Sequence, residues 1–550
     1  MRTSLVALLL FAAAPVLAAP PRLNFVYPAG AQRGTSVTAT FSGGDLKDVF
    51  GFYTSGTGVT AKIEPGGDAN NRTVTLTVAP DAPLGLQQVR VYDGAGLSNP
   101  RYFRVGQWPE ASEKEPNDAL TNAAKMTLPV TANGQIQQGT DRDGWTFHAK
   151  AGETVVCEIE GLRVLGQVGD SWLKGYLEIQ DKNGNMLAES QGTPDDYYRW
   201  DPLIAFSPPA EGDYTVFFRD LNWRGDNKAV YRLTVGVVPH ALGVFPLGGR
   251  WGESVDVQFA GPNLPASATR KVSLPAEGAV NSFDVDFTNP AGTTNARPFH
   301  LSDLPDVRQT VTAPGNQTRE TAQPVAVPCV VNGRLAKQGT RDFYKFTVEK
   351  PQKLILEVFS RRVGTPMDPE ILLYDAKNNL IQADDDARGR DCRIERDMVP
   401  GEYTLALRDV DDRGGDAFSY RLVLAPPAPR FRLIALPDAP KLARGQNLPL
   451  TVKIEREDGF DSEVAVTVEG LPAGVSASAL TIAKDKSEGQ ITFTATNDAA
   501  LGIARLSVVG AGKTGEKSLR AVARTQETYN IQGTAFQRDL IGPLLLITEK

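Results

Sequence analysis

The chain has 550 residues, a formal net charge of −7, 41% hydrophobic and 22% charged residues. The acidic balance argues against nucleic acid or an anionic membrane as the main partner, since either would require a basic face. The hydrophobic content excludes a disordered chain, and the length suits roughly three to five domains.

Residues 1–19 have the pattern of a secretory signal peptide. Arg2 supplies a positive charge, residues 5–14 form a short apolar run, and Ala18 ends a short-side-chain cleavage pattern. No later stretch reaches about 18 consecutive apolar residues, so the sequence predicts no membrane span. We therefore expect export of the mature chain, either to the periplasm or outside the cell.

Two segments, 20–108 and 239–303, repeat the same landmarks at one constant spacing. The first begins with Tyr27-Pro28-Ala29-Gly30 and the second with Phe245-Pro246-Leu247-Gly248. In both, a glycine turn and an alternating strand follow, which is typical of β-structure. The second copy is the shorter one.

Two longer segments, 113–237 and 315–426, form a second repeated pair. They share an Asn-Gly step, an Asp followed by alternating aromatic residues, a Gly-acid-Tyr-Thr turn and a closing Tyr-Arg-Leu. The chain is thus a duplicated two-domain unit, and a distinct domain with a terminal extension follows at 428–550. Short, β-branched runs between turn residues predict an all-β chain, a tandem array of jelly-roll-like and immunoglobulin-like β-sandwich domains.

The 113–237 segment resembles bacterial pre-peptidase C-terminal (PPC) domains. The resemblance rests on Glu115-Pro116-Asn117-Asp118, on Asp143-x-Trp145-x-Phe147 and on Gly212-Asp213-Tyr214-Thr215. The 315–426 segment shares the later landmarks, but its opening differs, with Gly315-Asn316-Gln317-Thr318 in place of the acidic motif. The resemblance implies a small β-sandwich that serves secreted proteins as an accessory module for binding or secretion.

The other segments are similar to immunoglobulin-like folds. The opening at 27–30 and the strand at 34–37 resemble the IPT/TIG type, and this extends to the copy at 239–303. The 428–550 segment resembles immunoglobulin-like domains of bacterial surface proteins, through the Gly-Leu-Pro-Ala-Gly-Val turn at 470–475.

The sequence predicts no catalytic machinery. Its three histidines, His148, His240 and His300, stand apart from any nucleophile motif or zinc-binding motif. Carboxylate pairs of the glycosidase type stay open, because acidic residues are plentiful.

An acidic loop in the 315–426 segment is the candidate metal site. Flexible loops rich in carboxylate oxygens suit Ca²⁺, and the alternative is a solvated acidic loop packed against nearby arginines. The predicted ligands are Asp384, Asp385, Asp386 and Asp391, with Asp368 and Asp409 completing the shell.

Aromatic residues of the 113–237 segment are candidate ligand contacts. Exposed aromatic rings suit carbohydrate stacking or a protein interface, and the alternative is that they cap the sandwich core. They are Trp172, Tyr197, Tyr198, Trp200 and Trp223.

Three cysteines do not make a disulfide scaffold. In an oxidising compartment, Cys329 and Cys392 are the candidates for a pair, which would leave Cys157 over. The alternative is three buried thiols acting as small apolar groups.

These features favour a secreted, non-catalytic binding or scaffold protein that engages an extracellular protein or polysaccharide. A first alternative is an accessory subunit of a secreted peptidase or other hydrolase system, with a secreted protease as partner. A second alternative is a hydrolase with an unrecognised carboxylate site.

Overall fold

The computed structural model of the protein describes residues 19–168, 171–192, 201–276, 281–310, 315–531, 534–540 and 542–549. In these residues the secondary structure is β-strand, apart from a 3-10 turn at Arg361–Val363 (η1). No helix in this part of the chain is long and apolar enough to cross a membrane. The prediction of tandem β-sandwich domains is confirmed. The predicted signal segment lies outside the described residues, apart from its last position.

The first domain, here called domain A, packs two four-stranded sheets on a core that includes Phe41, Leu76 and Phe103. The sheets have the orders β1-β3-β6-β5 and β2-β8-β7-β4. The strands are Arg22–Tyr27 (β1), Gly30–Gln32 (β2), Ser36–Gly44 (β3), Gly51–Thr54 (β4), Val59–Ile63 (β5), Asn71–Val78 (β6), Gly85–Tyr92 (β7) and Arg101–Gly106 (β8).

The second domain, module B, packs two five-stranded sheets of orders β10-β12-β19-β16-β17 and β18-β13-β20-β11-β9. In its core, the indole N–H of Trp145 donates to the Tyr231 hydroxyl at 3.1 Å. The strands are Glu110–Ser112 (β9), Ala124–Lys125 (β10), Val130–Gln135 (β11), Asp143–Ala149 (β12), Val155–Glu160 (β13), Gln167–Val168 (β14), Ser171–Trp172 (β15), Gly175–Asp181 (β16), Met186–Gln191 (β17), Leu203–Phe206 (β18), Gly212–Asp220 (β19) and Val230–Gly236 (β20).

The third domain, A′, is a smaller version of domain A. It has two three-stranded sheets, of orders β21-β23-β24 and β22-β28-β25, and a two-stranded ribbon. The strands are Gly243–Phe245 (β21), Gly248–Arg250 (β22), Ser254–Ala260 (β23), Thr269–Ser273 (β24), Ser282–Val285 (β25), Thr288–Asn289 (β26), Gly292–Thr293 (β27) and Arg297–Ser302 (β28).

The fourth domain, module B′, repeats the two five-stranded sheets of module B, in the orders β29-β31-β38-β33-β36 and β30-β32-β37-β34-β35. Its core holds Tyr344 and Tyr420 at the places of Trp145 and Tyr231. The strands are Asp306–Arg308 (β29), Gln323–Pro324 (β30), Cys329–Arg334 (β31), Asp342–Val348 (β32), Gln352–Phe359 (β33), Pro369–Asp375 (β34), Leu380–Asp384 (β35), Arg393–Met398 (β36), Gly401–Asp409 (β37) and Ser419–Ala425 (β38).

The last domain, called the C-terminal domain, takes its final strand from the terminal extension. Strand β51 lies between β40, to which it is parallel, and β46. The strands are Arg430–Leu436 (β39), Lys441–Ala443 (β40), Asn447–Glu457 (β41), Val464–Glu469 (β42), Val475–Ala477 (β43), Leu480–Ile482 (β44), Glu488–Ala495 (β45), Gly502–Arg505 (β46), Ser507–Thr514 (β47), Lys517–Val522 (β48), Thr525–Ile531 (β49), Thr534–Leu540 (β50) and Leu544–Thr548 (β51).

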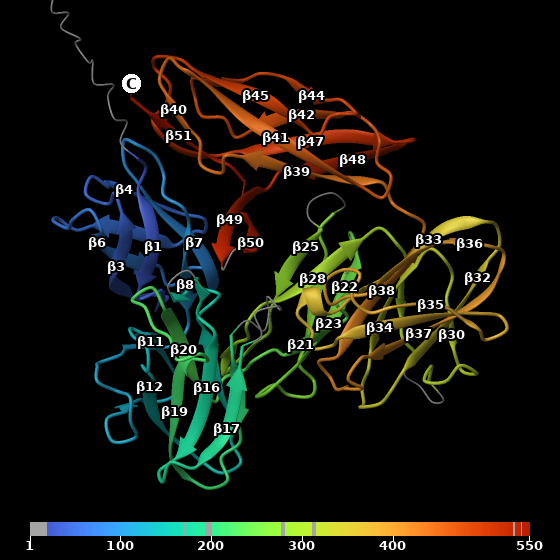
Figure 1. The fold of residues 1–550 in the computed structure, drawn as a ribbon, viewed down its shortest axis with the longest axis horizontal. Coiled ribbons are helices and arrows are strands. Elements are labelled where there is room, and N and C mark those ends of the chain that lie inside the picture. The colour runs from blue at the N-terminus through green and yellow to red at the C-terminus, as the bar shows by residue number, and fades with distance from the viewer. Residues whose placement is uncertain are drawn as a thin grey trace, which may run out of the picture.

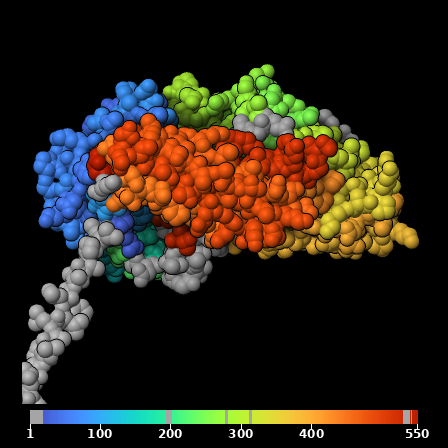
Figure 2. Space-filling view, turned by 90° about the horizontal axis from the view of Figure 1, so that it is seen from above, coloured from blue at the N-terminus to red at the C-terminus, as the bar shows by residue number. Residues whose placement is uncertain are grey.

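The chain folds back on itself, so that its last domain packs against its first (Figures 1 and 2). Leu544 and Leu546 of β51 form one apolar cluster with Leu97 of domain A. Beside it, the buried Arg90 of domain A donates to Asp438 at 2.6 Å. At its other end the C-terminal domain meets module B′, where Arg393 pairs with Asp458 at 2.8 Å. The five domains therefore form a closed arrangement.

Candidate metal centre at an acidic cluster of module B

Glu113 directly follows β9, the edge strand through which the chain enters module B from domain A. Strand β9 runs parallel to β11 and ends one residue before Glu113. The Glu113 N–H donates to the Asn133 carbonyl at 3.0 Å. Its carboxylate accepts the N–H of Gln135, with 3.0 Å to each oxygen. These backbone contacts fix both ends of the Glu113 residue.

Glu113 meets two other carboxylates there, Glu115 and Asp143, which we call the acidic cluster. One carboxylate oxygen from each lies within 4.8 Å of the others. Among the described residues, no second group of three carboxylate, thiol or imidazole side chains comes together in this way. Asp143 is fully buried at the start of β12, whereas Glu115 is exposed. The cluster therefore reaches from the module interior to solvent.

The environment of the cluster opposes ionisation of its carboxyl groups. Burial, with a smaller contribution from the charge of Glu115, raises the pKa of Glu113 to about 7. Burial and the charge of Glu113 raise the pKa of Asp143 well above its usual value. Like charges at short range disfavour joint ionisation, and a bound cation removes that penalty.

Buried polar atoms around the cluster have no hydrogen-bond partner within the described structure. They are both carboxylate oxygens of Asp143 and both polar atoms of the Asn117 amide, and both residues are fully buried. Buried polar groups normally have partners, so such orphans point to a missing ion or water. A β-carbon at Gly134 would collide with the Glu113 carboxylate and the Tyr231 hydroxyl. Glycine there leaves the space that the carboxylates occupy.

The chemistry of the donor set suits a hard divalent cation. Three carboxylates and one amide oxygen are the ligand types that Ca²⁺ prefers. A pocket of about 510 Å³ adjoins the cluster and has Glu115, Asp118 and Asp141 in its wall. Burial also raises the pKa of Asp141. The pocket offers an acidic path by which a cation can reach the cluster.

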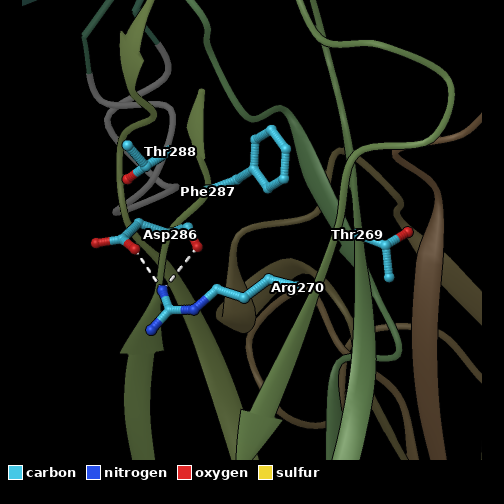
Figure 3. A pocket seen from close by; sticks show the side chains of 5 residues that line it. All are labelled: Thr269, Arg270, Asp286, Phe287 and Thr288. Carbon is cyan, nitrogen blue, oxygen red and sulfur yellow. Dashed lines mark hydrogen bonds and ion pairs between the residues drawn. The ribbon is translucent and has the colours of Figure 1, made fainter. Parts of the chain in front are cut away.

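A second hollow, in domain A′, has no comparable feature. Its volume is about 380 Å³, and it is lined by Thr269, Arg270, Asp286, Phe287 and Thr288 (Figure 3). Arg270 there donates to the side chain and to the backbone carbonyl of Asp286, at 2.5 and 2.8 Å. The two charges satisfy each other.

Module B′ has the same backbone arrangement as module B, but the neutral Gln309 stands at the position of Glu113. Gln309 takes the position of Glu113, because its N–H donates to the Asn332 carbonyl and its side-chain oxygen accepts the N–H of Arg334. The Gln309 amide then donates to Asn316 at 3.1 Å. Asn316 corresponds to Asn117, because their backbone carbonyls accept the N–H groups of Phe343 and Gly144, which occupy equivalent positions in the two modules.

The buried aspartate of module B′ has a short hydrogen bond from a tyrosine hydroxyl. The Tyr420 hydroxyl donates to Asp342 at 2.6 Å, whereas its equivalent in module B, Tyr231, makes no bond of this quality to Asp143. Burial raises the pKa of Asp342 to about 7. In module B′ a single aspartate with one short donor thus stands where module B has three carboxylates.

Within the described ranges, no three of the predicted calcium ligands of module B′ bring their carboxylate oxygens within 4.8 Å of one another. Asp391 is fully buried and accepts the N–H groups of Ser360 and Arg361, at 3.2 and 2.7 Å. Asp409 is also fully buried and accepts the N–H groups of Asp368 and Arg413, at 2.8 and 3.0 Å. These two aspartates hold loops of the backbone in place.

The other predicted ligands of that loop point to separate partners. Asp384 accepts the N–H groups of Ala387 and Arg393, and Asp368 pairs with Arg361 and Arg390. Asp385 and Asp386 are exposed. Module B contains the same architecture in Asp201 and Asp220, which likewise accept backbone N–H groups. The repeat therefore indicates a structural role for these aspartates.

The predicted aromatic contacts are partly visible. Tyr197, Tyr198 and Trp200 lie outside the described residues. Trp172 is half-buried in β15, and Trp223 is 47% exposed. The Arg219 guanidinium lies between the rings of Trp223 and Tyr176, 4.1 and 4.0 Å from their centroids. Trp223 thus belongs to a surface stack and does not cap the core.

The suggested disulfide between Cys329 and Cys392 is absent, and all three cysteines are buried free thiols. Cys329 lies on β31, and Cys392 directly precedes β36, three strands away in the sheet. Neighbouring strands are about 4.8 Å apart, so the two Cα atoms are separated by about 14 Å, beyond the bridging range.

The sequence contains a signal for the acidic cluster. Glu115-Pro116-Asn117-Asp118 brings two carboxylates and an amide together within four residues. Glu113 gave no signal of its own, since its role depends on β9 lying beside β11.

Comparisons with known proteins give matches to solved structures alone. No protein-family model matches it, and no curated protein matches it. A PPC domain of a collagenase from Bacillus anthracis is 19% identical over 19% of this chain and 93% of that chain, with a TM-score of 0.17. Fibronectin(III)-like modules of CbhA from Clostridium thermocellum are 15% identical over 37% of this chain and 90% of that chain, with a TM-score of 0.12.

Another match aligns with most of this chain and with half of a longer protein. Trypsin-activated alpha-2-macroglobulin from Escherichia coli is 12% identical over 98% of this chain and 50% of that chain, with a TM-score of 0.15.

Proposed function

We propose that this is an exported, non-catalytic binding or scaffold protein whose module B holds one divalent cation, Ca²⁺, as a structural cofactor. The observation that supports this is the acidic cluster, with its orphaned Asp143 and Asn117 side chains. Glu113, Glu115 and Asp143 would supply carboxylate oxygens, and Asn117 its amide oxygen. The cation supplies positive charge that neutralises the cluster and holds its residues together.

The partner we propose is an extracellular protein or polysaccharide. Module B offers the stack of the exposed Trp223 on the half-buried Arg219 and Tyr176 as a contact surface. Aromatic rings and arginine are the residue types that most often dominate such contacts. The alternative is an accessory subunit of a secreted hydrolase system, in which the partner bound at this surface would be a secreted protease.

Calorimetric titration of the full mature chain with Ca²⁺ tests the cofactor. We expect one ion per chain, and a cation at 100 times its Kd should stabilise the native module by about 2.7 kcal/mol. Asp143→Asn should abolish binding, whereas the matched Asp342→Asn in module B′ should leave it unchanged. Absence of binding to the wild-type chain would refute the proposal.

A second control addresses the acidic loop predicted from the sequence. The triple variant Asp384→Asn, Asp385→Asn and Asp386→Asn should bind Ca²⁺ as the wild type does. Loss of binding in this variant, with binding retained in Asp143→Asn, would move the site to module B′.

A further inference from the structure

Module B′ docks on domain A′ by inserting an apolar side chain into the core of that domain. Val363 of η1 is 2% exposed and belongs to the core cluster of domain A′, and Phe359 packs against the same cluster. Beside them, the Arg297 guanidinium of domain A′ donates to the Gly364 carbonyl of module B′. We call this contact the A′–B′ junction. Separation of the two domains would expose Val363 to solvent.

A histidine of domain A′ lies in the A′–B′ junction. His300, on β28, lies against the Phe359 ring of module B′, with 5.7 Å between the ring centroids. The Arg362 guanidinium lies over the same ring, 3.8 Å from its centroid. Arg421 reaches the junction from β38 and donates to Ser302, two residues beyond His300, at 2.9 Å. The imidazole therefore lies in the field of two guanidinium groups of module B′.

The carboxyl groups around His300 have arginine neighbours of their own. They are Asp284 near Arg297, Asp306 with Arg421, Glu357 with Arg362, and Asp391 with Arg362. The neighbouring strand β22 presents Gly248 opposite His300 and adds no charge there. In the described part of the chain, none of these carboxyl groups forms an ion pair or a hydrogen bond with His300. A protonated imidazole would thus have no carboxylate partner in the junction.

These surroundings oppose a positive charge on His300. Burial, followed by the charges of Arg421 and Arg362, lowers the pKa of His300 to about 4. If the two domains separate, both arginines remain with module B′, and the imidazole returns to solvent, where histidine ordinarily has a pKa of about 6.5. The separated state therefore binds a proton more tightly than the docked state. By linkage, docking weakens as the pH falls from about 6.5 toward 4.

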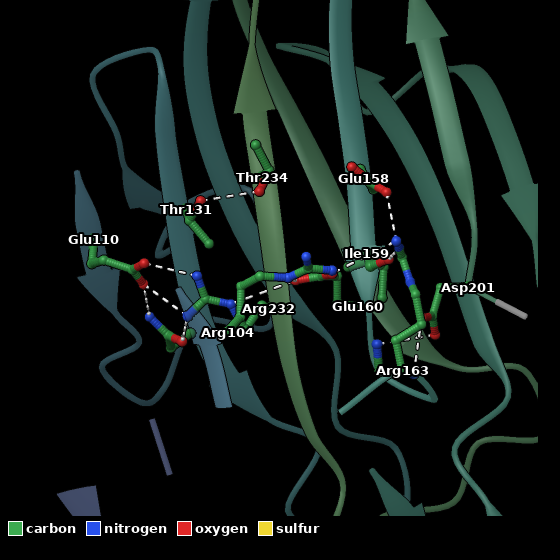
Figure 4. Close-up of polar contacts among 12 residues, drawn as sticks. Arg104, Glu110, Thr131, Glu158, Ile159, Glu160, Arg163, Asp201, Arg232 and Thr234 are labelled. Carbon is green, nitrogen blue, oxygen red and sulfur yellow. Dashed lines mark hydrogen bonds and ion pairs between the residues drawn. The ribbon is translucent and has the colours of Figure 1, made fainter. Parts of the chain in front are cut away.

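The junction between domain A and module B has an ion pair in the corresponding place. Arg104 stands where His300 stands, and Glu160 stands where Phe359 stands. The Arg104 Nε atom donates to Glu160 at 3.0 Å (Figure 4). Burial opposes the charge of Glu160, but Arg104 and Arg163 hold its pKa below the ordinary value. Both charges persist at pH 5, so acid should leave this ion pair intact.

We infer that protonation of His300 loosens the docking of module B′ on domain A′, so that the closed arrangement opens at this junction in acid surroundings while domain A stays docked on module B. The inference does not depend on the proposed cation site, because no residue of the acidic cluster takes part. Module B′ would stay attached to the C-terminal domain through the pair of Arg393 and Asp458. One of two duplicated junctions would thus respond to the pH outside the cell.

Thiol labelling of the full mature chain tests this inference. Val363→Cys places a thiol that becomes accessible when the A′–B′ junction opens. Val164→Cys is the matched control, because Val164 is equally buried at the equivalent position and clusters with Ala29 of domain A. The three native thiols are buried, so the unchanged chain serves as the blank.

The reagent is 4,4′-dithiodipyridine, which reacts at acid pH, at concentrations where labelling is slower than redocking. The labelling rate is then proportional to the fraction of molecules with an open junction. Each rate is divided by the rate of a short cysteine peptide at the same pH. All solutions contain EGTA, so that no cation at the acidic cluster contributes.

We expect the corrected rate of Val363→Cys to rise about 20-fold between pH 7 and pH 5, as the shift of the His300 pKa to about 4 requires. The rate of Val164→Cys should change less than about twofold over the same range. Combining Val363→Cys with His300→Gln or with His300→Phe should remove the rise, because neither replacement can take up a proton. Two replacements are used, and labelling of the native thiols identifies a variant that fails to fold.

Three results would overturn the inference. The first is a corrected rate of Val363→Cys that is the same at pH 5 and pH 7. The second is a rise that persists in both His300 variants, which would point instead to Asp391, whose pKa burial raises to about 6. The third is an equal rise in Val164→Cys, which would show a general loosening of the chain. None of these results bears on the calorimetric test of Ca²⁺ binding, so the two proposals stand or fall separately.

Discussion

The Arg232 guanidinium occupies the space that a side chain at Gly30 would need. A β-carbon on Gly30 would lie 2.5 Å from the Cζ atom of Arg232. The second copy repeats the pair, since a β-carbon on Gly248 would lie 2.9 Å from the Cζ atom of Arg421. Both arginines are nearly fully buried and pair with an acid on the strand that enters the module. The glycine–arginine contact between domain A and module B, here called the joint, is therefore repeated between domain A′ and module B′.

Gly30→Ala should therefore loosen the first joint. The new methyl group would overlap the buried Arg232 guanidinium. Overpacking of this kind typically lowers the free energy of unfolding by about 1–3 kcal/mol. We expect faster hydrogen exchange along β9 and β2, with the core of module B unaffected. Gly44→Ala in the same domain is the control, because a β-carbon there has nothing within 4 Å. Equal protection in the Gly30→Ala and Gly44→Ala variants would contradict the role of the pair.

Substitutions on the two faces of β51 should have different effects, because one face fills the core of the C-terminal domain and the other contacts domain A. Leu545 and Ile547 fill the core of the C-terminal domain, while Leu544 and Leu546 pack on domain A. Leu546→Ala combined with Asp438→Asn should open the closed arrangement and increase the radius of gyration in solution scattering. Leu545→Ala should instead destabilise the C-terminal domain by about 2–5 kcal/mol. An unchanged radius in the first variant would show that other contacts hold the closure.

Ca²⁺ affinity should depend on pH through Glu113. Its pKa of about 7 means that the group is protonated below that value, and a cation must displace the proton. We expect the affinity to rise by up to about tenfold per pH unit as the pH increases toward 7. Titration calorimetry in buffers of different ionisation enthalpy should detect the released proton at pH 6. Equal affinity at pH 6 and pH 8 would contradict this assignment.

Module B′ should lose stability as the pH rises. The pKa of Asp342 is raised by burial to about 7 in the folded state. A raised pKa means that the folded state binds the proton more tightly, so stability falls between about pH 4 and pH 7. Asp342→Asn keeps an acceptor for Tyr420 and should remove this dependence, with a gain on the order of 1–3 kcal/mol at pH 8. Urea unfolding of the wild type and of Asp342→Asn at pH 5 and pH 8 measures this difference. The same change in free energy of unfolding with pH in both proteins would contradict the prediction.

The sequence by itself determined the all-β class and the duplicated order of segments. Strand alternation and turn residues are local properties, and a repeat is visible by comparing the chain with itself. The Glu115-Pro116-Asn117-Asp118 motif was also readable, although its chemistry was not.

Only the tertiary structure decided which carboxylates meet. Asp391 and Asp409 stand in an acidic stretch that favours a metal, yet folding surrounds each with backbone N–H donors. Glu113 stands just before the acidic motif at 115–118, yet only sheet pairing brings it to Asp143. The reason is physical: the role of a carboxylate is set by its burial and by the donors around it, and distant strands supply both.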